Sequence, residues 1–337
     1  MDHIAIDLGG AQSQVCVRAG DGTVLVERRC RTAELEAYLA SRPPSRVVVE
    51  TCAEAFSVAD SAKRLGHEVR VVAATLVRTL GVGARGVKTD RRDAQVLSEV
   101  SCRIDLPSVH VPSAQSRERK SLCGMRDVQV HCRTMLINSV RGWMRTRMDK
   151  VKSGTTQHFP LRVRAFYGDK LPEQIAWQLM SIERLTEQIK SFERVLQSMA
   201  KEDPVCRRLM TVPGVGWLTA LRFVATLDEI GRFANAHQVE SYLGLTPGED
   251  SSSERQRRTS ITKAGSPSMR WLLVQAAWSA RRARRKDALQ LWAEQLEQRR
   301  GKRVAVVALA RKLAGILFAI WRDGSTYRAE EAAAASS

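Results

Sequence analysis

The sequence predicts a mixed α/β domain followed by a largely helical region, in a chain of 337 residues. Residues 1–105 alternate short apolar strands with helices, and helical spacing of apolar residues takes over from residue 113. A third observation concerns charge, because 54 Lys and Arg face 36 Asp and Glu, a net charge of +18. So large an excess repels itself unless it meets an acidic partner, most often nucleic acid. A membrane surface is the weaker alternative.

The N-terminal segment shows a regular order of elements. Residues 3–8, 14–18 and 23–27 have the pattern of three strands joined by glycine turns, which predicts an antiparallel meander. The following elements alternate: a helix at 32–40, a strand at 46–50, a helix at 53–65, a strand at 68–72, and helices at 74–80 and 90–102. This order indicates one mixed sheet covered by helices. It is found in RNase H-like domains, and we expect such a domain over residues 1–112.

The middle segment, residues 113–203, is predicted to be helical and basic. Ten Lys or Arg face three acids between residues 113 and 152, which indicates a solvated basic helix face. Apolar residues from Ile175 to Met199 recur mostly at heptad spacing. The spacing predicts a coiled-coil connection, within or between chains, and through it a homo-oligomer such as a dimer or tetramer.

A C-terminal helical domain is predicted over residues 204–328. Its Pro213-Gly214-Val215-Gly216 turn between two apolar helices indicates a helix-hairpin-helix, whose glycine amides can bind a backbone phosphate. Such a turn serves equally often for packing alone. Residues 248–263 are expected to form an exposed loop, with three further helices up to residue 321, and the Ala-Ser tail at 329–337 is expected to be disordered.

Four carboxylates stand at positions that suggest chemistry. Asp7 and Glu50 each end an apolar strand, while Asp90 and Asp93 stand three residues apart where a helix begins and so share one helix face. Each has a plainer explanation, because strands end in water and acids cap helices. Together they supply the hard oxygen ligands that a site for two magnesium ions on a phosphodiester requires.

These acids also carry a family resemblance. The order Ile6-Asp7-Leu8-Gly9, Val49-Glu50-Thr51 and Lys88-Thr89-Asp90-x-x-Asp93-Ala94 resembles the DEDD transposases of the insertion-sequence "one-ten" family, bridge-RNA-guided recombinases with a RuvC-like domain. The C-terminal segments 212–216, 242–247 and 261–265 are similar to that family's second domain. The likeness covers about residues 3–322. It implies that Asp7, Glu50, Asp90 and Asp93 bind Mg²⁺, with two ions expected.

The resemblance also implies a serine nucleophile in the loop after Gly-Leu-x-Pro. Counting forward from Pro247 places Ser252 at that position, whereas counting back from Lys263 places Ser251 there. Ser252 is the preferred assignment. A serine hydroxyl needs help to lose its proton and to neutralise the phosphoryl charge, and the metal-bound carboxylates supply both if the N- and C-terminal units meet. In the family they meet between subunits.

A second concentration of charge lies near the C-terminus. Sixteen Lys or Arg face four acids between Glu254 and Lys312, and this net charge favours contact with a phosphate backbone. Trp271, Trp278 and Trp292 lie on the same helices and are expected to be core residues more than base-stacking ones. The implied partners are element DNA, target DNA and, by resemblance, a guide RNA from the element.

The preferred function is that of a transposase or site-specific DNA recombinase that joins DNA through a covalent phosphoserine. A Holliday-junction resolvase-like nuclease would use the same acids to activate water. A sugar-kinase or actin-type ATPase is a further alternative because Ile6-Asp7-Leu8-Gly9-Gly10 resembles a phosphate loop, and a non-catalytic nucleic-acid-binding protein is the last. Without a secretory signal or a long uncharged apolar run, a cytoplasmic protein with no membrane contact is expected.

Overall fold

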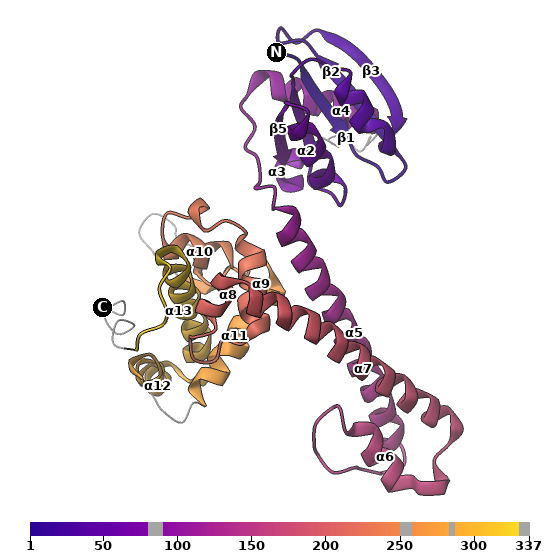
Figure 1. Ribbon diagram of the computed structural model, residues 1–337, viewed down its shortest axis with the longest axis vertical. Helices are drawn as coiled ribbons and strands as arrows, with labels where there is room; N and C mark the ends of the chain where they lie inside the picture. Colours follow the sequence, from indigo (N-terminus) through magenta and orange to yellow (C-terminus); the bar gives the residue numbers. More distant parts are fainter. Residues whose placement is uncertain (80–89, 250–257, 283–286, 330–337) are drawn as a thin grey trace. The chain divides into compact units, whose positions relative to one another are not determined.

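The computed structural model describes residues 1–79, 90–249, 258–282 and 287–329 (Figure 1). The chain forms two compact units, Met1–Pro112 and Ser113–Ser337. Each is described separately below. The expected disorder of the tail falls almost wholly on residues 330–337, which lie outside the described residues.

A five-stranded mixed sheet forms the centre of the first unit. Its strands are β1 (His3–Asp7), β2 (Gln12–Arg18), β3 (Val24–Arg31), β4 (Arg46–Glu50) and β5 (Glu68–Val72), in the order β3-β2-β1-β4-β5. The first three strands form the predicted antiparallel meander, while β4 runs parallel to β1 and β5 parallel to β4. The predicted mixed sheet is therefore confirmed.

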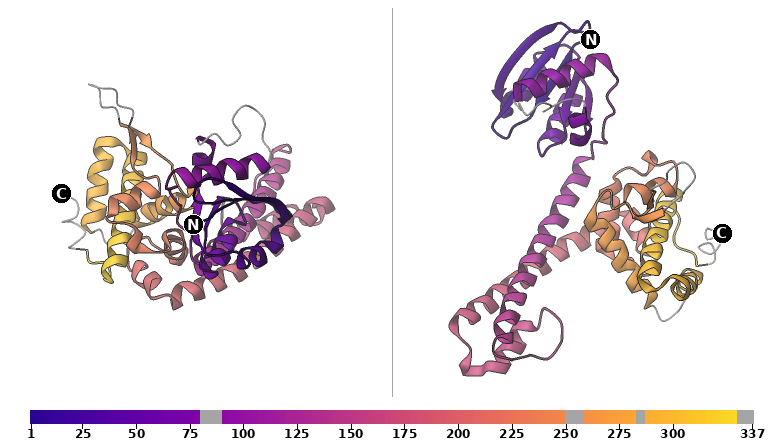
Figure 2. Two further views of the ribbon diagram at one scale, coloured as in Figure 1. Left: turned by 90° about the horizontal axis from the view of Figure 1, so that it is seen from above. Right: turned by 180° about the vertical axis from the view of Figure 1, so that it is seen from behind.

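Helices cover both faces of this sheet, because side chains along each strand alternate between the faces. Ile4 and Ile6 pack with α1 (Leu35–Ala40) and α2 (Ala55–Arg64), behind a short 3₁₀ turn at Thr32–Glu34. Ala5 and its neighbour Val48 pack on the opposite face with α3 (Ala74–Thr79) and α4 (Asp90–Arg103). Figure 2 shows α4 lying across that face.

The second unit begins with a long helical arm. Helix α5 (Ala114–Arg145) packs against α7 (Glu173–Glu202), and α6 (Phe159–Tyr167) with a 3₁₀ turn at Gly168–Lys170 closes the end where they connect (Figure 1). The apolar stripe of α7, including Ile182 and Ile189, is buried in this packing. Of the two alternatives for the heptad pattern, the structure has the one within the chain.

The predicted solvated basic face of α5 is only partly present. Arg119 is buried and its Nη1 lies 2.8 Å from an oxygen of Asp203, while Arg126 Nη2 lies 2.5 Å from Glu193 Oε1. The two pairs join α5 to α7 and to the residue after it, and their order shows that the two helices are antiparallel. Basic residues that face the partner helix and basic residues that face solvent recur with the same helical spacing. The sequence therefore does not distinguish paired from solvated cations.

Replacing Ile182 with Asp should destabilise this unit. Ile182 has no exposed surface and belongs to the arm core, so an aspartate there would be an unpaired buried charge. We expect the free energy of unfolding to fall by about 3–5 kcal/mol. Chemical denaturation followed by circular dichroism measures it, with the exposed Glu187→Ala as control. An unchanged unfolding midpoint would show that the arm core is not formed as described.

A helical body completes the second unit. It contains α8 (Pro204–Leu209), α9 (Trp217–Leu227), α10 (Ala236–Tyr242), α11 (Pro267–Arg281), α12 (Ala288–Arg300) and α13 (Lys302–Asp323), with a 3₁₀ turn at Ile230–Arg232. One hydrophobic cluster joins these helices to Cys123 of α5 and Leu196 of α7. The segments 113–203 and 204–328 thus share a core.

The helix expected up to residue 321 is present as α13. Its length and composition would suit a membrane span, but half of its apolar window is buried in the fold, as in a core helix. One sequence expectation changes in this body. The region predicted as a loop contains a ribbon of β6 (Pro247–Glu249) and β7 (Arg258–Ile261). Strands this short give too little alternation to be recognised in a polar sequence.

The predicted helix-hairpin-helix turn joins α8 to α9, and Gly214 is held there by packing. It has φ +83°, and an added Cβ would lie 2.2 Å from the backbone oxygen of Ala276 in α11. Both facts exclude a side chain at this position. The packing role that the sequence left open therefore accounts for this glycine.

Gly214→Ala should consequently destabilise the helical body. The new methyl group must push α9 and α11 apart, and alanine also resists the positive φ, so we expect a loss of about 2–4 kcal/mol. Thermal unfolding measures the change. Gly231→Ala is the control, since nothing lies within 4 Å of its added Cβ and its φ is not in the left-handed region. Equal stability of the two variants would contradict the described contact.

Candidate active site

Asp7 and Glu50 lie side by side at the carboxyl ends of adjacent parallel strands. Ile6 is paired with Val49, and Asp7 and Glu50 are the next residues of the two strands. Both have the same alternation as Ala5 and Val48, so their side chains leave the sheet on the α4 face. The two carboxylates therefore share one edge and one face of the sheet.

The turn after Asp7 is fixed by close contacts. An added Cβ on Gly9 would lie 2.4 Å from the backbone oxygen of Gln12, which leaves room only for glycine. The hydroxyl of Thr32 donates to the Gly9 carbonyl at 2.6 Å. Beyond Glu50, the Thr51 amide donates to the Val72 carbonyl at 2.9 Å. The backbone that carries both carboxylates is thus held on each side.

Two side-chain hydrogen bonds set the register of α4 on the sheet. Ser101 Oγ lies 2.8 Å from His3 Nδ1 at the start of β1, and Ser98 Oγ donates to Cys16 Sγ at 3.2 Å, level with Ala5. Helix α4 therefore runs antiparallel to β1. Two further strand residues, from Ala5 to Asp7, span about 6.6 Å, which equals about four helical residues. Four residues before Ser98 in α4 is the helical turn that carries Asp93, so this turn lies level with Asp7.

Asp93 faces inward from this turn. It is only 6% exposed and lies on the same helix face as Ala94, Leu97 and Ser98, which are also buried. Asp90 stands one turn earlier at the first residue of α4 and is exposed. The structure therefore brings Asp7, Glu50 and Asp93 to one end and one face of the sheet, with Asp90 at the solvent side of the same helix start.

Glu27 of β3 anchors the first turns of α4, a role that the sequence did not reveal. Arg91 Nε donates to Glu27 Oε2 at 2.8 Å, and Gln95 donates to Glu27 Oε1. Hydrogen bonds from Gln95 and Arg91 hold the pKa of Glu27 below its ordinary value. An acid in a meander strand with a distant basic partner has no local signature, so only the folded arrangement identifies it.

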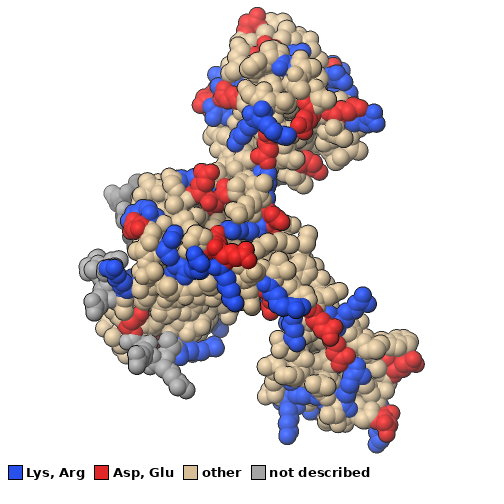
Figure 3. Space-filling model, in the orientation of Figure 1, with Lys and Arg blue, Asp and Glu red and all other residues tan. Residues whose placement is uncertain are grey.

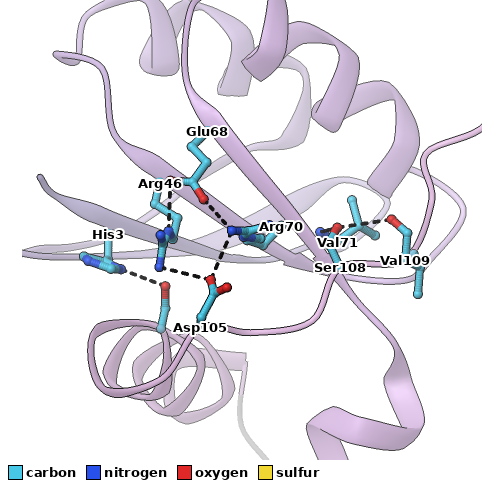
Figure 4. Close-up of polar contacts among 9 residues, drawn as sticks. His3, Arg46, Glu68, Arg70, Val71, Asp105, Ser108 and Val109 are labelled. Atoms are coloured by element: carbon cyan, nitrogen blue, oxygen red, sulfur yellow. Dashed lines mark hydrogen bonds and ion pairs between the residues drawn. The ribbon is translucent and has the colours of Figure 1, made fainter.

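The other end of α4 is held by a polar network (Figure 4). Arg70 Nη2 lies 2.9 Å from Glu68 Oε1 and 3.0 Å from Asp105 Oδ1, while Arg46 Nε lies 3.2 Å from Glu68 Oε2. Asp105 lies just beyond Arg103, the last residue of α4, so these pairs tie the segment after the helix to β4 and β5. Burial, with Arg46 nearby, lowers the pKa of His3, whose ring is hydrogen-bonded to Ser101.

The chemistry of the donors suits magnesium. Asp7, Glu50 and Asp93 offer only carboxylate oxygens, which Mg²⁺ prefers over nitrogen or sulfur ligands. Among the residues that the structure describes, no three His, Cys, Asp or Glu side chains form a group already close enough to hold a metal ion. The three carboxylates thus lie at one edge of the sheet, but they are farther apart than the ligands of a bound ion.

The two candidate nucleophiles cannot be placed in the same way. Ser251 and Ser252 lie in residues 250–257, outside the described residues, between β6 and β7. The neighbouring backbone is well fixed: Arg270 donates to the carbonyls of Leu243 at 3.2 Å and Gly265 at 3.1 Å. These contacts fix the backbone just before β6 and just after β7, the two strands that precede and follow residues 250–257 in the sequence.

The C-terminal basic segment is divided between packing and surface. Arg311 Nε lies 2.5 Å from Glu240 Oε2, and Arg281 pairs with Glu297. Trp278 and Trp292 pack against the core as expected, and Lys312 Nζ lies 4.5 Å from the ring centre of Trp292. Trp271, by contrast, is 59% exposed. The cluster at residues 284–286 lies outside the described residues.

Comparison with known families identifies the chain from both ends. A DEDD transposase model, described as "Transposase", matches residues 4–148, and a model described as "Transposase IS116/IS110/IS902 family" matches residues 206–293. The first match contains all four candidate carboxylates, and the second contains Ser251 and Ser252.

Curated relatives agree over nearly the full length. The "Probable family 20 transposase" of Pseudomonas aeruginosa is 30% identical over 97% of this chain and 99% of its own. The "Transposase for insertion sequence element IS1111A" of Coxiella burnetii is 28% identical over 96% and 91%, and that for IS1328 of Yersinia enterocolitica is 26% identical over 96% and 98%. This chain is therefore an enzyme acting on DNA, a member of the IS116/IS110/IS902 family of insertion-sequence transposases.

Proposed function

We propose that this transposase cuts and joins DNA by direct attack of a serine, Ser252, with Asp7, Glu50, Asp90 and Asp93 as the magnesium ligands. The observation that carries the proposal is the convergence of Asp7, Glu50 and Asp93 at one edge of the sheet. The mixed sheet with β4 and β5 parallel to β1 supports an RNase H-like, RuvC-type assignment for this unit. Divalent-metal dependence is in keeping with a DEDD transposase domain.

The chemistry divides between the two units. The Ser252 hydroxyl oxygen forms a bond to the phosphorus of a DNA phosphodiester, the serine proton leaves, and the displaced deoxyribose oxygen takes up a proton. The strand break is thereby stored as a protein–DNA ester, which a DNA hydroxyl can later attack to rejoin strands. Bound Mg²⁺ would neutralise phosphoryl charge and make the attacking oxygen a better nucleophile.

The carboxylates of this chain have a positioning task in that scheme. The register of α4 positions buried Asp93, and strand pairing positions Asp7 and Glu50, so the site is held by its scaffold before DNA binds. The resemblance described above extends the proposal to element DNA, target DNA, a guide RNA and a homo-oligomer in which serine and carboxylates come from different subunits.

The experiment is cleavage of labelled element-end DNA by the purified protein with Mg²⁺, analysed on denaturing gels. The proposal expects a labelled strand joined to protein. Cleavage products that never carry protein would assign the attack to water and favour the resolvase-like alternative. Absence of cleavage and of adduct, with DNA still bound, would favour a non-catalytic nucleic-acid-binding protein.

A further inference from the structure

The far end of the arm contains a basic cavity that the proposed chemistry does not use. Its volume is about 570 Å³, and it is bounded by the end of α5, the following segment and α6. The cations that line it are Arg141, Arg145, Lys150, Lys152 and Arg162. Figure 3 shows Lys and Arg side chains projecting from this end of the arm.

The charge of this arm-tip cavity is not balanced by the protein. Among the described residues, none of its five cations forms an ion pair. Asp149 is the one acid among the described lining residues, and its Oδ2 accepts a hydrogen bond from Tyr167 at 2.7 Å. By contrast, Arg164 of α6 is paired with Glu183 at 3.2 Å. The cavity therefore offers uncompensated charge to an external anion.

Two of the five cations, Arg141 and Arg162, are held in place beside an apolar floor. The Arg141 guanidinium lies 5.3 Å from the ring centre of buried Phe159, and Arg162 Nη2 donates to the Thr155 carbonyl at 2.9 Å. Met144 lines the floor and is buried, whereas Met148 is 93% exposed at the rim. The cavity combines cationic side chains, two of them held by contacts, with apolar surface, and its size is that of a site for an organic ligand rather than a bare ion.

We propose that the arm-tip cavity binds a single-stranded segment of nucleic acid, with phosphates on Arg145, Lys150 and Lys152 and one base against the apolar floor. A phosphodiester chain matches the spread of cations, whereas a single small anion would need only one or two of them. A duplex keeps its bases stacked inside and could use only the rim. The proposal rests on the family's action on DNA and is independent of the serine mechanism.

The test compares two triple variants of the full-length protein. Arg145→Glu, Lys150→Glu and Lys152→Glu reverse the charge of the tip, and Lys190→Glu, Arg194→Glu and Lys201→Glu make the same change on exposed positions of α7. None of these six residues forms an ion pair in the described part of the chain. Binding of fluorescent oligothymidylate, oligouridylate and a DNA duplex is measured by anisotropy in EDTA, so that cleavage plays no part.

The tip variant should bind the single strands about tenfold more weakly than the α7 variant. Its salt dependence should be shallower, with the magnitude of the slope of log affinity against log salt smaller by about two. Duplex binding should decrease by a smaller factor. A larger loss for oligouridylate than for oligothymidylate would identify the strand as RNA, and the reverse would identify it as DNA. Equal losses in the two variants, or a loss confined to the duplex, would overturn the proposal. Circular dichroism of both variants excludes misfolding as the cause.

Discussion

Asp7→Asn is expected to reduce strand cleavage by about a thousandfold or more while DNA binding changes by less than about twofold. Asn keeps the shape of the side chain but removes the negative charge that would hold a divalent cation. DNA affinity comes mainly from Lys and Arg, which the change leaves untouched. The end of β1 is also held by strand pairing with β2 and β4, so the fold should persist.

Labelled-strand cleavage and filter binding measure the two effects separately. Asp105→Asn is the matched control, because it is a carboxylate of the same unit at the opposite end of the parallel strands, with a side chain 73% exposed. It should retain nearly full cleavage, since exposed ion pairs contribute little. Cleavage by Asp7→Asn at the rate of this control would remove Asp7 from the metal site.

Ser252→Ala is expected to abolish the covalent protein–DNA adduct and leave thermal stability nearly unchanged. The substitution removes only the hydroxyl group, and without its oxygen the DNA strand has no serine at this position to which it can be joined. Ser251→Ala should be much milder. The control is Ser260→Ala, an exposed hydroxyl on β7. An adduct that persists in Ser252→Ala and vanishes in Ser251→Ala would move the nucleophile to Ser251.

The first unit was predictable from sequence because its signals are local. Apolar runs of β-branched residues that end in a lone acid, such as Ile4 to Asp7 and Val47 to Glu50, mark both the strand and its carboxyl end. The pairing of β1 with β4 then places the two acids together. The bounds of most helices lie within two residues of the expected ones, whereas the strand registers come from the structure alone.

The positioning of Asp93 was less accessible. It depends on Ser98 and Ser101, small polar residues on a helix, meeting Cys16 and His3 across the sheet. Such contacts join residues more than 80 positions apart and have no pattern along the chain. The heptad spacing of α7 had the converse difficulty, because it is the same whether the partner helix belongs to the same chain or to another.

The basic segments show a similar limit. Counting charges indicated a solvated basic face for the α5 region, but Arg119 and Arg126 pair with acids inside the arm. The five cations of the arm-tip cavity, by contrast, form no ion pair in the described part of the chain. Net charge along a sequence gives the class of partner, and only the ion pairs of the fold show which cations remain for it.

The most direct measurement is the metal dependence of the covalent adduct in the unaltered protein. Labelled element-end DNA is incubated with the protein across a Mg²⁺ titration and in EDTA, and the adduct is quantified on denaturing gels. A carboxylate site that serves a serine nucleophile predicts an adduct that rises with Mg²⁺, is absent in EDTA and is absent from Asp7→Asn at every concentration. An adduct of equal yield in EDTA, or full cleavage in Mg²⁺ with no adduct, would contradict it.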